Sequence, residues 1–173
     1  SSDLGRQRNT AKLILSKNDN KKPKLIEHDG FKEWNYGGYE GKTDKEMWTP
    51  IFEANGFKLD DDWSDYDKLV EKIGDDGIAN AIAENDPLKA AENYDEITTR
   101  GQAAMDMVIK DSKKKNAKNV MIVSSGGMIP TLLEMLVPDA YNVEMMENCS
   151  VTTLKYKDGK YTLDKIGDTQ YIE

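Results

Sequence analysis

The sequence predicts one domain of the α/β class, and three observations support this prediction. The length of 173 residues fits a single domain. Segments with helical spacing of apolar residues alternate with short apolar runs of β-strand character. The alternating segments Ser150–Tyr156 and Lys160–Ile166 flank an Asp158-Gly159 pair, which is typical of a β-hairpin. With 38 % hydrophobic residues, the chain can form one core.

The N-terminal part predicts a helix, a loop, a strand and a second loop. Four apolar residues share one helical face over residues 3–17: Leu4, Ala11, Ile14 and Leu15. A polar loop over 18–23 follows, and then a short strand over 24–27. Residues 31–41 are rich in aromatic residues and glycine, so we expect an irregular loop.

Residues 44–97 form a strongly acidic segment that we expect to be helical. It holds sixteen acidic residues and five lysines, a net charge of −11, whereas the rest of the chain carries +3. Four residues are expected to interrupt its helices: Gly56, Gly74, Gly77 and Pro87.

The next segment predicts a helix, a strand and another helix. A helix over 96–115 ends in three lysines, where the helix dipole favours cations. The β-branched apolar run at 119–124 suits a buried parallel strand. Residues 128–137 return to helical spacing.

The composition excludes several classes of function. The formal net charge of −8 and pI near 4.8 argue against a nucleic-acid partner, because phosphate neutralisation needs a basic surface. The longest apolar runs have four residues, so no transmembrane segment is predicted. One cysteine, Cys149, excludes an internal disulfide and a multi-cysteine zinc site, and one histidine, His28, excludes a two-histidine metal site.

The chain starts at Ser1 without an initiator methionine, a signal peptide or a tag. We interpret this start as that of a fragment, of a processed product, or of a chain without its first segment. Any targeting signal would lie upstream, so the sequence leaves localisation open, with the cytoplasm as the default.

Ser124-Ser125-Gly126-Gly127 is the segment with the clearest chemical signal. It joins the expected strand to the expected helix, where backbone amides and the helix dipole can bind an anion. The alternative is an ordinary glycine turn at the end of a strand. A nucleophile elbow is excluded because Val123 stands where that motif needs glycine.

Two further segments carry candidate residues. Arg6, early in the first helix, could direct its bidentate guanidinium at an oxyanion, or it could belong to a solvated helix face. Glu33 stands beside Trp34 and Tyr36, where partial desolvation would favour a general acid. The alternative for Glu33 is a surface loop whose aromatic residues pack on the core.

Taken in order, these segments resemble the histidine phosphatase superfamily, which has the phosphoglycerate-mutase-like fold. Residues 1–10 are similar to its Ser-Ser-Asp-Leu-x-Arg-x-x-x-Thr motif, and residues 33–37 are similar to the stretch that carries its acid. Residues 124–127 match a stretch usually written Ser-His-Gly-Gly, and Asn148 to Thr152 with the hairpin resemble its closing strands. The resemblance covers essentially the whole chain.

The resemblance implies a three-layer α/β sandwich and a role for each matching residue. Arg6, Gly126 and Gly127 would bind phosphate, and Ser124 and Asn35 would line the site. Glu33 would act as the acid, and Ser125 would occupy the position of a catalytic histidine. The family hydrolyses or transfers the phosphate of small phosphomonoesters through a phosphohistidine, so we expect a small phosphorylated partner and neither a metal nor another cofactor.

Two departures affect the catalytic centre. The family's N-terminal Arg-His-Gly motif, which carries the nucleophile, is absent from these 173 residues, and Ser125 replaces the second catalytic histidine. Losing a charge-assisted donor to the developing oxyanion costs about 10²–10³ in rate, and losing the nucleophile removes the covalent route. We expect His28 to be structural. The domain would therefore be an impaired phosphatase-like hydrolase or, alternatively, an inactive phosphate-ligand-binding or scaffold domain.

The resemblance also implies how the domain is organised. Residues 1–173 would form one domain that is incomplete at its N-terminus, with residues 44–97 inserted as a cap over the site. Its acidic charge would repel polyanions. Residues 119–124 would expose an unpaired edge, so we expect either a strand from a missing N-terminal segment or self-association.

Overall fold

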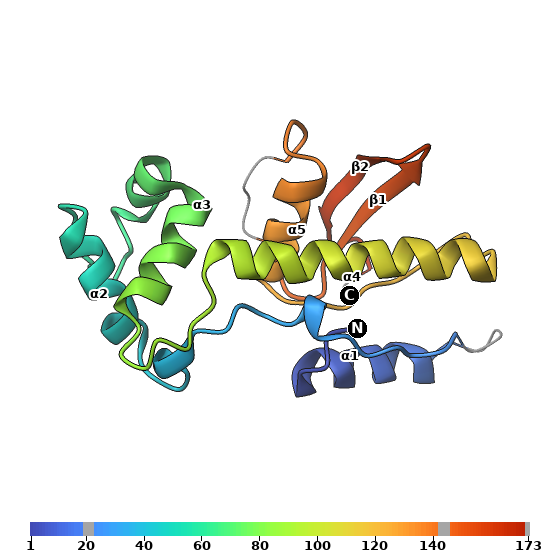
Figure 1. Cartoon of the computed structure of the whole chain (residues 1–173), viewed down its shortest axis with the longest axis horizontal. Coiled ribbons are helices and arrows are strands. Elements are labelled where there is room, and N and C mark those ends of the chain that lie inside the picture. The colour runs from blue at the N-terminus through green and yellow to red at the C-terminus, as the bar shows by residue number, and fades with distance from the viewer. Residues whose placement is uncertain (19–22, 142–145, 172–173) are drawn as a thin grey trace.

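The computed structural model describes residues 1–18, 23–141 and 146–171, so residues 19–22 of the expected polar loop lie outside the described part. Seven helical elements and two strands are assigned in it. In chain order they are α1 (Gly5–Ser16), η1 (Asp29–Phe31), η2 (Gly37–Tyr39), α2 (Asp44–Ala54), α3 (Tyr66–Asn85), α4 (Tyr94–Lys115), α5 (Met128–Leu136), β1 (Val151–Lys157) and β2 (Lys160–Asp168). The α/β class is confirmed. Figure 1 shows α2 and α3 as a lobe beside a body that contains α1, α4, α5 and the hairpin.

The long helix α4 runs across the body and is defined at both ends by its sequence. Asn93 forms a capping box with Glu96, and Asn116 ends the helix in the left-handed conformation. The last turn contains the three expected lysines, next to the negative end of the helix dipole. The prediction of a helix over 96–115 is therefore confirmed, with a start two residues earlier.

The predictions of α1, α5 and the hairpin are also confirmed. In α1, however, Ala11 is buried while Leu4 and Ile14 are both 41 % exposed, so the apolar face is only partly covered. The strands β1 and β2 pair antiparallel around Asp158 and Gly159. Both turn residues have positive φ, 50° and 83°, as a tight type I′ hairpin requires.

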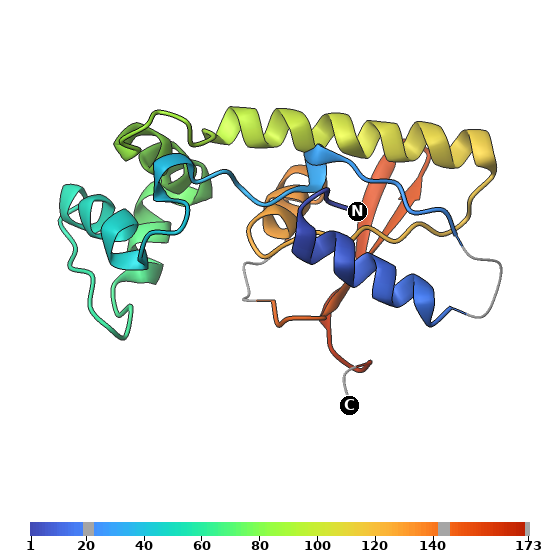
Figure 2. The ribbon, with the colours of Figure 1, turned by 90° about the horizontal axis from the view of Figure 1, so that it is seen from below.

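The two expected strands at 24–27 and 119–124 are not strands in the structure. Both segments are extended connections, and Figure 2 shows them running between α4 and α1. A strand needs a neighbour to which its backbone can bond along its length. Among the described residues, the only backbone bond of this kind made by 119–124 links the Val123 carbonyl to the Ser2 amide. Val120 and Met121 are 53 % and 61 % exposed, so this run is not buried as expected.

The acidic segment contains two helices whose interruptions agree with most of the predicted positions. Gly56, with φ of 81°, follows the end of α2, and Pro87 follows the end of α3. Gly74 has φ of 70° and produces a kink inside α3. Gly77 does not interrupt the helix, so that prediction is wrong; a glycine lowers helix stability by only about 1 kcal/mol, which packing offsets.

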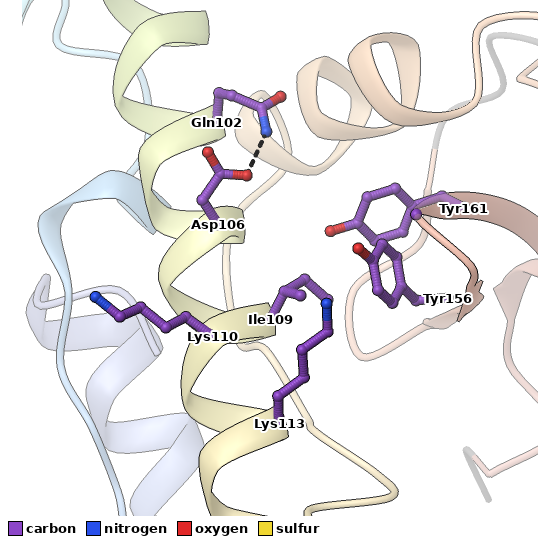
Figure 3. A pocket seen from close by; sticks show the side chains of 8 residues that line it. Gln102, Asp106, Ile109, Lys110, Lys113, Tyr156 and Tyr161 are labelled. Atoms are coloured by element: carbon purple, nitrogen blue, oxygen red, sulfur yellow. Dashed lines mark hydrogen bonds between the residues drawn. The ribbon is translucent and has the colours of Figure 1, made fainter.

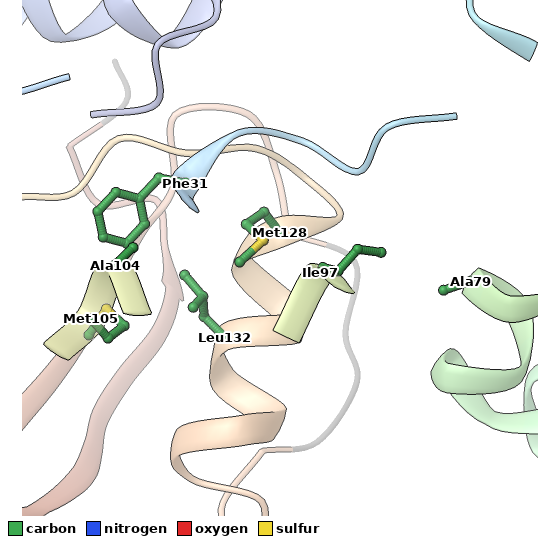
Figure 4. Packing of buried hydrophobic residues seen from close by; sticks show 7 residues of the cluster. All are labelled: Phe31, Ala79, Ile97, Ala104, Met105, Met128 and Leu132. Carbon is green, nitrogen blue, oxygen red and sulfur yellow. The ribbon is translucent and has the colours of Figure 1, made fainter. Parts of the chain in front are cut away.

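Two hydrophobic clusters stabilise the two parts of the molecule. One joins η1, α4 and α5 and includes Phe31, Ile97, Ala104 and Met128. Figure 4 shows Phe31 next to Ala104, with Met128 between Phe31 and Ile97. The other cluster lies within the α2–α3 lobe and is formed by Ile51, Phe52, Leu69, Ile78 and Ile82. The first cluster places the loop at 30–35 against the start of α5.

No helix in the described part of the chain is both long and apolar enough to cross a membrane.

Candidate functional site

The structure brings together two of the three predicted segments, the loop at 30–35 and the turn at 124–131. The Ser124 hydroxyl donates to the Phe31 carbonyl at 2.7 Å. The Trp34 indole N–H donates to Thr131 Oγ1 at 3.1 Å, from a position 97 residues earlier in the chain. These bonds hold the loop that carries Glu33 against the first turn of α5.

The Glu33 carboxyl group lies at the N-terminus of α5. Its Oε2 accepts a hydrogen bond from the Gly127 amide at 3.0 Å, and its Oε1 accepts one from the Trp34 amide at 2.9 Å. Gly127 is the N-cap of α5, where the helix has free amides and the positive end of its dipole. The Glu33 carboxyl group therefore accepts a hydrogen bond from the Gly127 amide, one of the two amides expected to bind phosphate.

Ser125 and Gly126 lie beside this contact. The Ser125 hydroxyl oxygen is buried and has no hydrogen-bond partner among the described residues. Gly126 is exposed, and a Cβ built on it would meet no atom within 4 Å. The turn therefore offers a buried hydroxyl group and an open backbone next to the start of a helix. Buried polar groups usually have partners, so this hydroxyl could bind a polar ligand.

Arg6 is exposed in the first turn of α1, and its guanidinium makes no hydrogen bond or ion pair with the described residues. Ser1 and Ser2, upstream of α1, are each held by a backbone hydrogen bond. The Ser2 amide donates to the Val123 carbonyl at 3.0 Å, and the His28 amide donates to the Ser1 carbonyl at 2.9 Å. The start of α1 is thus tied next to Ser124, but the structure records no contact between Arg6 and the turn.

Asn35 and His28 both use their side chains within the protein. Asn35 Nδ2 donates to the Ala90 carbonyl at 3.0 Å, and its Oδ1 accepts from the Gly37 amide at 3.0 Å. His28 Nδ1 accepts from the Gly30 amide at 3.0 Å and so caps η1. This contact agrees with the structural role expected for His28.

Asp86 organises the junction between the α2–α3 lobe and the loop that follows Glu33. Its carboxylate is 1 % exposed and accepts hydrogen bonds from four amides, at 2.6–3.0 Å: those of Gly38, Leu88, Ala90 and Ala91. Burial alone would raise the pKa of Asp86, but these bonds lower it to about 2. Asp86 is therefore a structural carboxylate that fixes η2 in place.

Glu92 and Arg100 were not predicted as site residues. Their side chains form an ion pair of 2.8 Å and bond to the backbone of the loop that carries Glu33. The sequence did contain a signal for Arg100. It lies three residues after Ile97 and four before Ala104, both fully buried, so an arginine stands on the apolar face of α4. A cation in such a position is normally paired. Its partners could not be identified without the fold.

A groove of about 400 Å³ lies elsewhere, between α4 and the hairpin. Figure 3 shows Lys113 directed toward the pair formed by Tyr156 and Tyr161, with Gln102 bonded to Asp106 on the same helix face. None of the residues that line this groove belongs to the three segments that carry the candidate site residues, 1–10, 31–41 and 124–127. Within the described part of the chain, no group of three or more His, Cys, Asp or Glu residues could hold a metal ion.

Comparisons with known proteins agree with the motifs. A model of the histidine phosphatase superfamily (branch 1) matches residues 1–169. Phosphoglycerate mutase from Bacillus anthracis str. Sterne is similar in structure, with a TM-score of 0.84 and 32 % identity over 98 % of this chain and 71 % of that chain. YhfR of Bacillus stearothermophilus shares the fold, with a TM-score of 0.63 and 19 % identity over 99 % of this chain and 74 % of that chain. No curated protein matches significantly. The phosphoglycerate-mutase-like fold expected from the resemblance is thereby confirmed.

Proposed function

The chain belongs to the histidine phosphatase superfamily, and on this premise we propose that it binds the phosphate group of a small phosphorylated molecule at the turn formed by residues 124–127. The observation that carries this proposal is the buried, unpartnered Ser125 hydroxyl beside the open backbone of Gly126, at the start of α5. A hydroxyl donor, a free amide and a helix dipole together favour an anion.

Arg6 supplies the positive charge in this proposal. It is exposed and unpaired among the described residues, so its guanidinium can turn toward a bound anion without breaking an ion pair. Glu33 supplies a carboxyl group at the same turn, as the acid of the family would. While its carboxyl group is ionised it competes with phosphate for the Gly127 amide, so we expect weak binding, with Kd of about 1 mM or −4 kcal/mol.

The charge of the acidic segment at 44–97 disfavours polyanionic substrates. Its net charge of −11 repels polyanions over distances comparable to the Debye length, about 10 Å at 0.1 M salt. A small molecule with one phosphate group fits this charge better than a nucleic acid or a polyphosphate. In the proposed organisation, the α2–α3 lobe is the cap of the site.

Phosphate titration by NMR at fixed ionic strength tests the proposal, with the Ser125, Gly126 and Gly127 amides as reporters. Arg6→Ala is expected to weaken binding about tenfold, because a charge-assisted hydrogen bond contributes about 1.5–3 kcal/mol. Arg8→Ala is the matched control, since Arg8 lies on the same helix but pairs with Glu27 at 3.3 Å. Amides that do not shift, or that shift equally in the Arg6→Ala variant, would refute the phosphate site.

An assay with a generic aryl phosphate separates an impaired enzyme from a binding domain. We expect no turnover from the 173 residues, and none after Ser125→His alone, because the lone histidine, His28, is used as a cap of η1. Turnover by the Ser125→His variant would mean that His28 or another group attacks phosphorus, and would establish a phosphatase instead.

A further inference from the structure

Arg100 has all five of its N–H groups matched by acceptors on the segment that carries Glu33 and on Glu92. It forms a bidentate pair with Glu92, from Nε to Oε1 at 2.8 Å and from Nη2 to Oε2 at 2.9 Å. Its other N–H groups donate to the carbonyls of Gly30 at 3.2 Å, Lys32 at 3.0 Å and Glu33 at 3.1 Å. The guanidinium therefore bonds directly to the backbone of Glu33.

Glu92 holds the same loop from the other side of Glu33. Its Oε2 accepts the Asn35 amide at 3.0 Å, and its own amide donates to the Asn35 carbonyl at 2.9 Å. Burial acts to raise the pKa of Glu92, but the hydrogen bonds and the charge of Arg100 oppose it, and the pKa of Glu92 is lowered overall. The side chains of Glu92 and Arg100 are 15 % and 14 % exposed, so little water competes for their bidentate hydrogen bonds.

Close packing leaves this loop little freedom to move. A Cβ on Gly30 would lie 2.5 Å from Ala104 Cβ and 2.6 Å from the Arg100 carbonyl oxygen, so η1 packs directly on α4. Arg100 Nη1 also contacts Met128 Sδ at 3.5 Å, next to Gly127 at the start of α5. Arg100 thus contacts the Glu33 backbone and also Met128, the residue that directly follows Gly127.

We propose that Arg100, through its fork of hydrogen bonds, is a positioning residue that holds the Glu33 carboxyl group at the Gly127 amide. The proposal rests on the function proposed above, in which Glu33 acts at the phosphate turn. A planar guanidinium offers five N–H groups in a fixed geometry, whereas lysine offers three on a single nitrogen. Lysine at position 100 would keep the charge for Glu92 but could not bond all of the loop carbonyls at once.

The test compares Arg100→Lys with the parent chain by NMR, without ligand. We expect the Gly127 amide to change chemical shift and to exchange with solvent about tenfold faster, because its charge-assisted acceptor is no longer held in place. The Trp34 amide, which donates to the same carboxyl group, should respond in the same way. In Arg100→Lys, the amides of the hairpin should keep their protection against hydrogen exchange. In the control variant Arg8→Lys, all amides should keep it.

A double-mutant cycle with Glu33→Gln shows whether the effect passes through the Glu33 side chain. The response of Gly127 to Arg100→Lys should be greatly reduced when Glu33 is already glutamine. An unchanged Gly127 amide in Arg100→Lys would overturn the proposal, and so would an equal loss of protection at all amides, since that indicates a general structural role. If Arg100→Lys does not fold, Glu92→Gln carries the same test, with a smaller response at Gly127 expected.

Because the Arg100→Lys comparison is made without ligand, the positioning role of Arg100 and the proposed phosphate site are tested separately. If phosphate shifts no amide of the parent chain, the proposed function fails, while the Arg100 comparison is still decided by Gly127. If phosphate binds but Arg100→Lys leaves Gly127 unchanged, only the positioning role fails.

Discussion

At the scale of single residues, the candidate site depends on how close Glu33 comes to Gly127. A side chain on Gly127 would place its Cβ 2.5 Å from Glu33 Oε1. Gly127 has φ of −87° and ψ of −40°, which any residue can adopt. Any constraint on this position therefore comes from the close approach of the Glu33 carboxyl group and not from the backbone conformation.

We expect Gly127→Ala to displace the Glu33 carboxyl group and to lower the free energy of unfolding by about 1–3 kcal/mol, as for loss of a hydrogen bond to a charged group. A Cβ at position 126 would meet no atom within 4 Å. Gly126→Ala should therefore change the free energy of unfolding by less than about 0.5 kcal/mol. Chemical denaturation of both variants measures the difference. Equal effects at the two positions would contradict the close contact.

At the scale of elements, residues 119–124 are an extended segment without strand neighbours in the described chain. Their sequence is that of a buried strand, yet Val120 and Met121 are exposed. An apolar segment with unbonded backbone groups is a template for another strand.

We therefore predict that the 173 residues self-associate through 119–124, unless a strand from a further segment pairs there. Sedimentation velocity over a range of concentrations should show association, and Val120→Lys should reduce it, because a charge on an edge opposes pairing. Lys118→Arg serves as a control that keeps the charge of the neighbouring surface. A monodisperse and cooperatively folded monomer of the parent chain would count against both forms of pairing.

At the scale of the whole molecule, the α2–α3 lobe meets the body at a cluster of acidic and tyrosine side chains. The Tyr94 hydroxyl donates to Glu134 Oε2 at 2.7 Å, which joins α4 to α5. Burial, followed by the charge of Glu134, raises the pKa of Asp75 on α3. Burial and the same carboxylates raise the pKa of Tyr141 to about 12. Asp75 is therefore a carboxyl group of the lobe whose ionised form is disfavoured by folding.

Asp75→Asn is expected to stabilise the protein at pH 7. Folding raises the pKa of Asp75 above the value of about 3.9 that it has in the unfolded chain. Its contribution to the free energy of unfolding is therefore fully present below about pH 3.9 and is lost as the pH rises through the pKa of the folded state. The increase in the free energy of unfolding caused by Asp75→Asn should therefore become smaller as the pH falls, and it should vanish below about pH 4. Thermal unfolding between pH 3 and pH 7 measures it, with the exposed neighbour in Asp76→Asn as the control. A gain that does not depend on pH would contradict this origin.

Features that depend on near neighbours in the chain can be predicted from the sequence. The Asp158-Gly159 turn and the helical spacing of residues 128–137 both act within about four residues, and both appear where predicted. The four motifs, taken in order, also indicated the superfamily, which the match over residues 1–169 confirms.

The tertiary structure alone decided the features that depend on distant partners. Residues 24–27 and 119–124 have the composition of strands, but a strand forms only where a neighbour can bond to its backbone. The acceptor of the Gly127 amide is Glu33, 94 residues earlier, and Arg100 bonds to carbonyls up to 70 residues away. No local pattern specifies such pairs, because their geometry exists only once η1, α4 and α5 pack together around Phe31 and Met128.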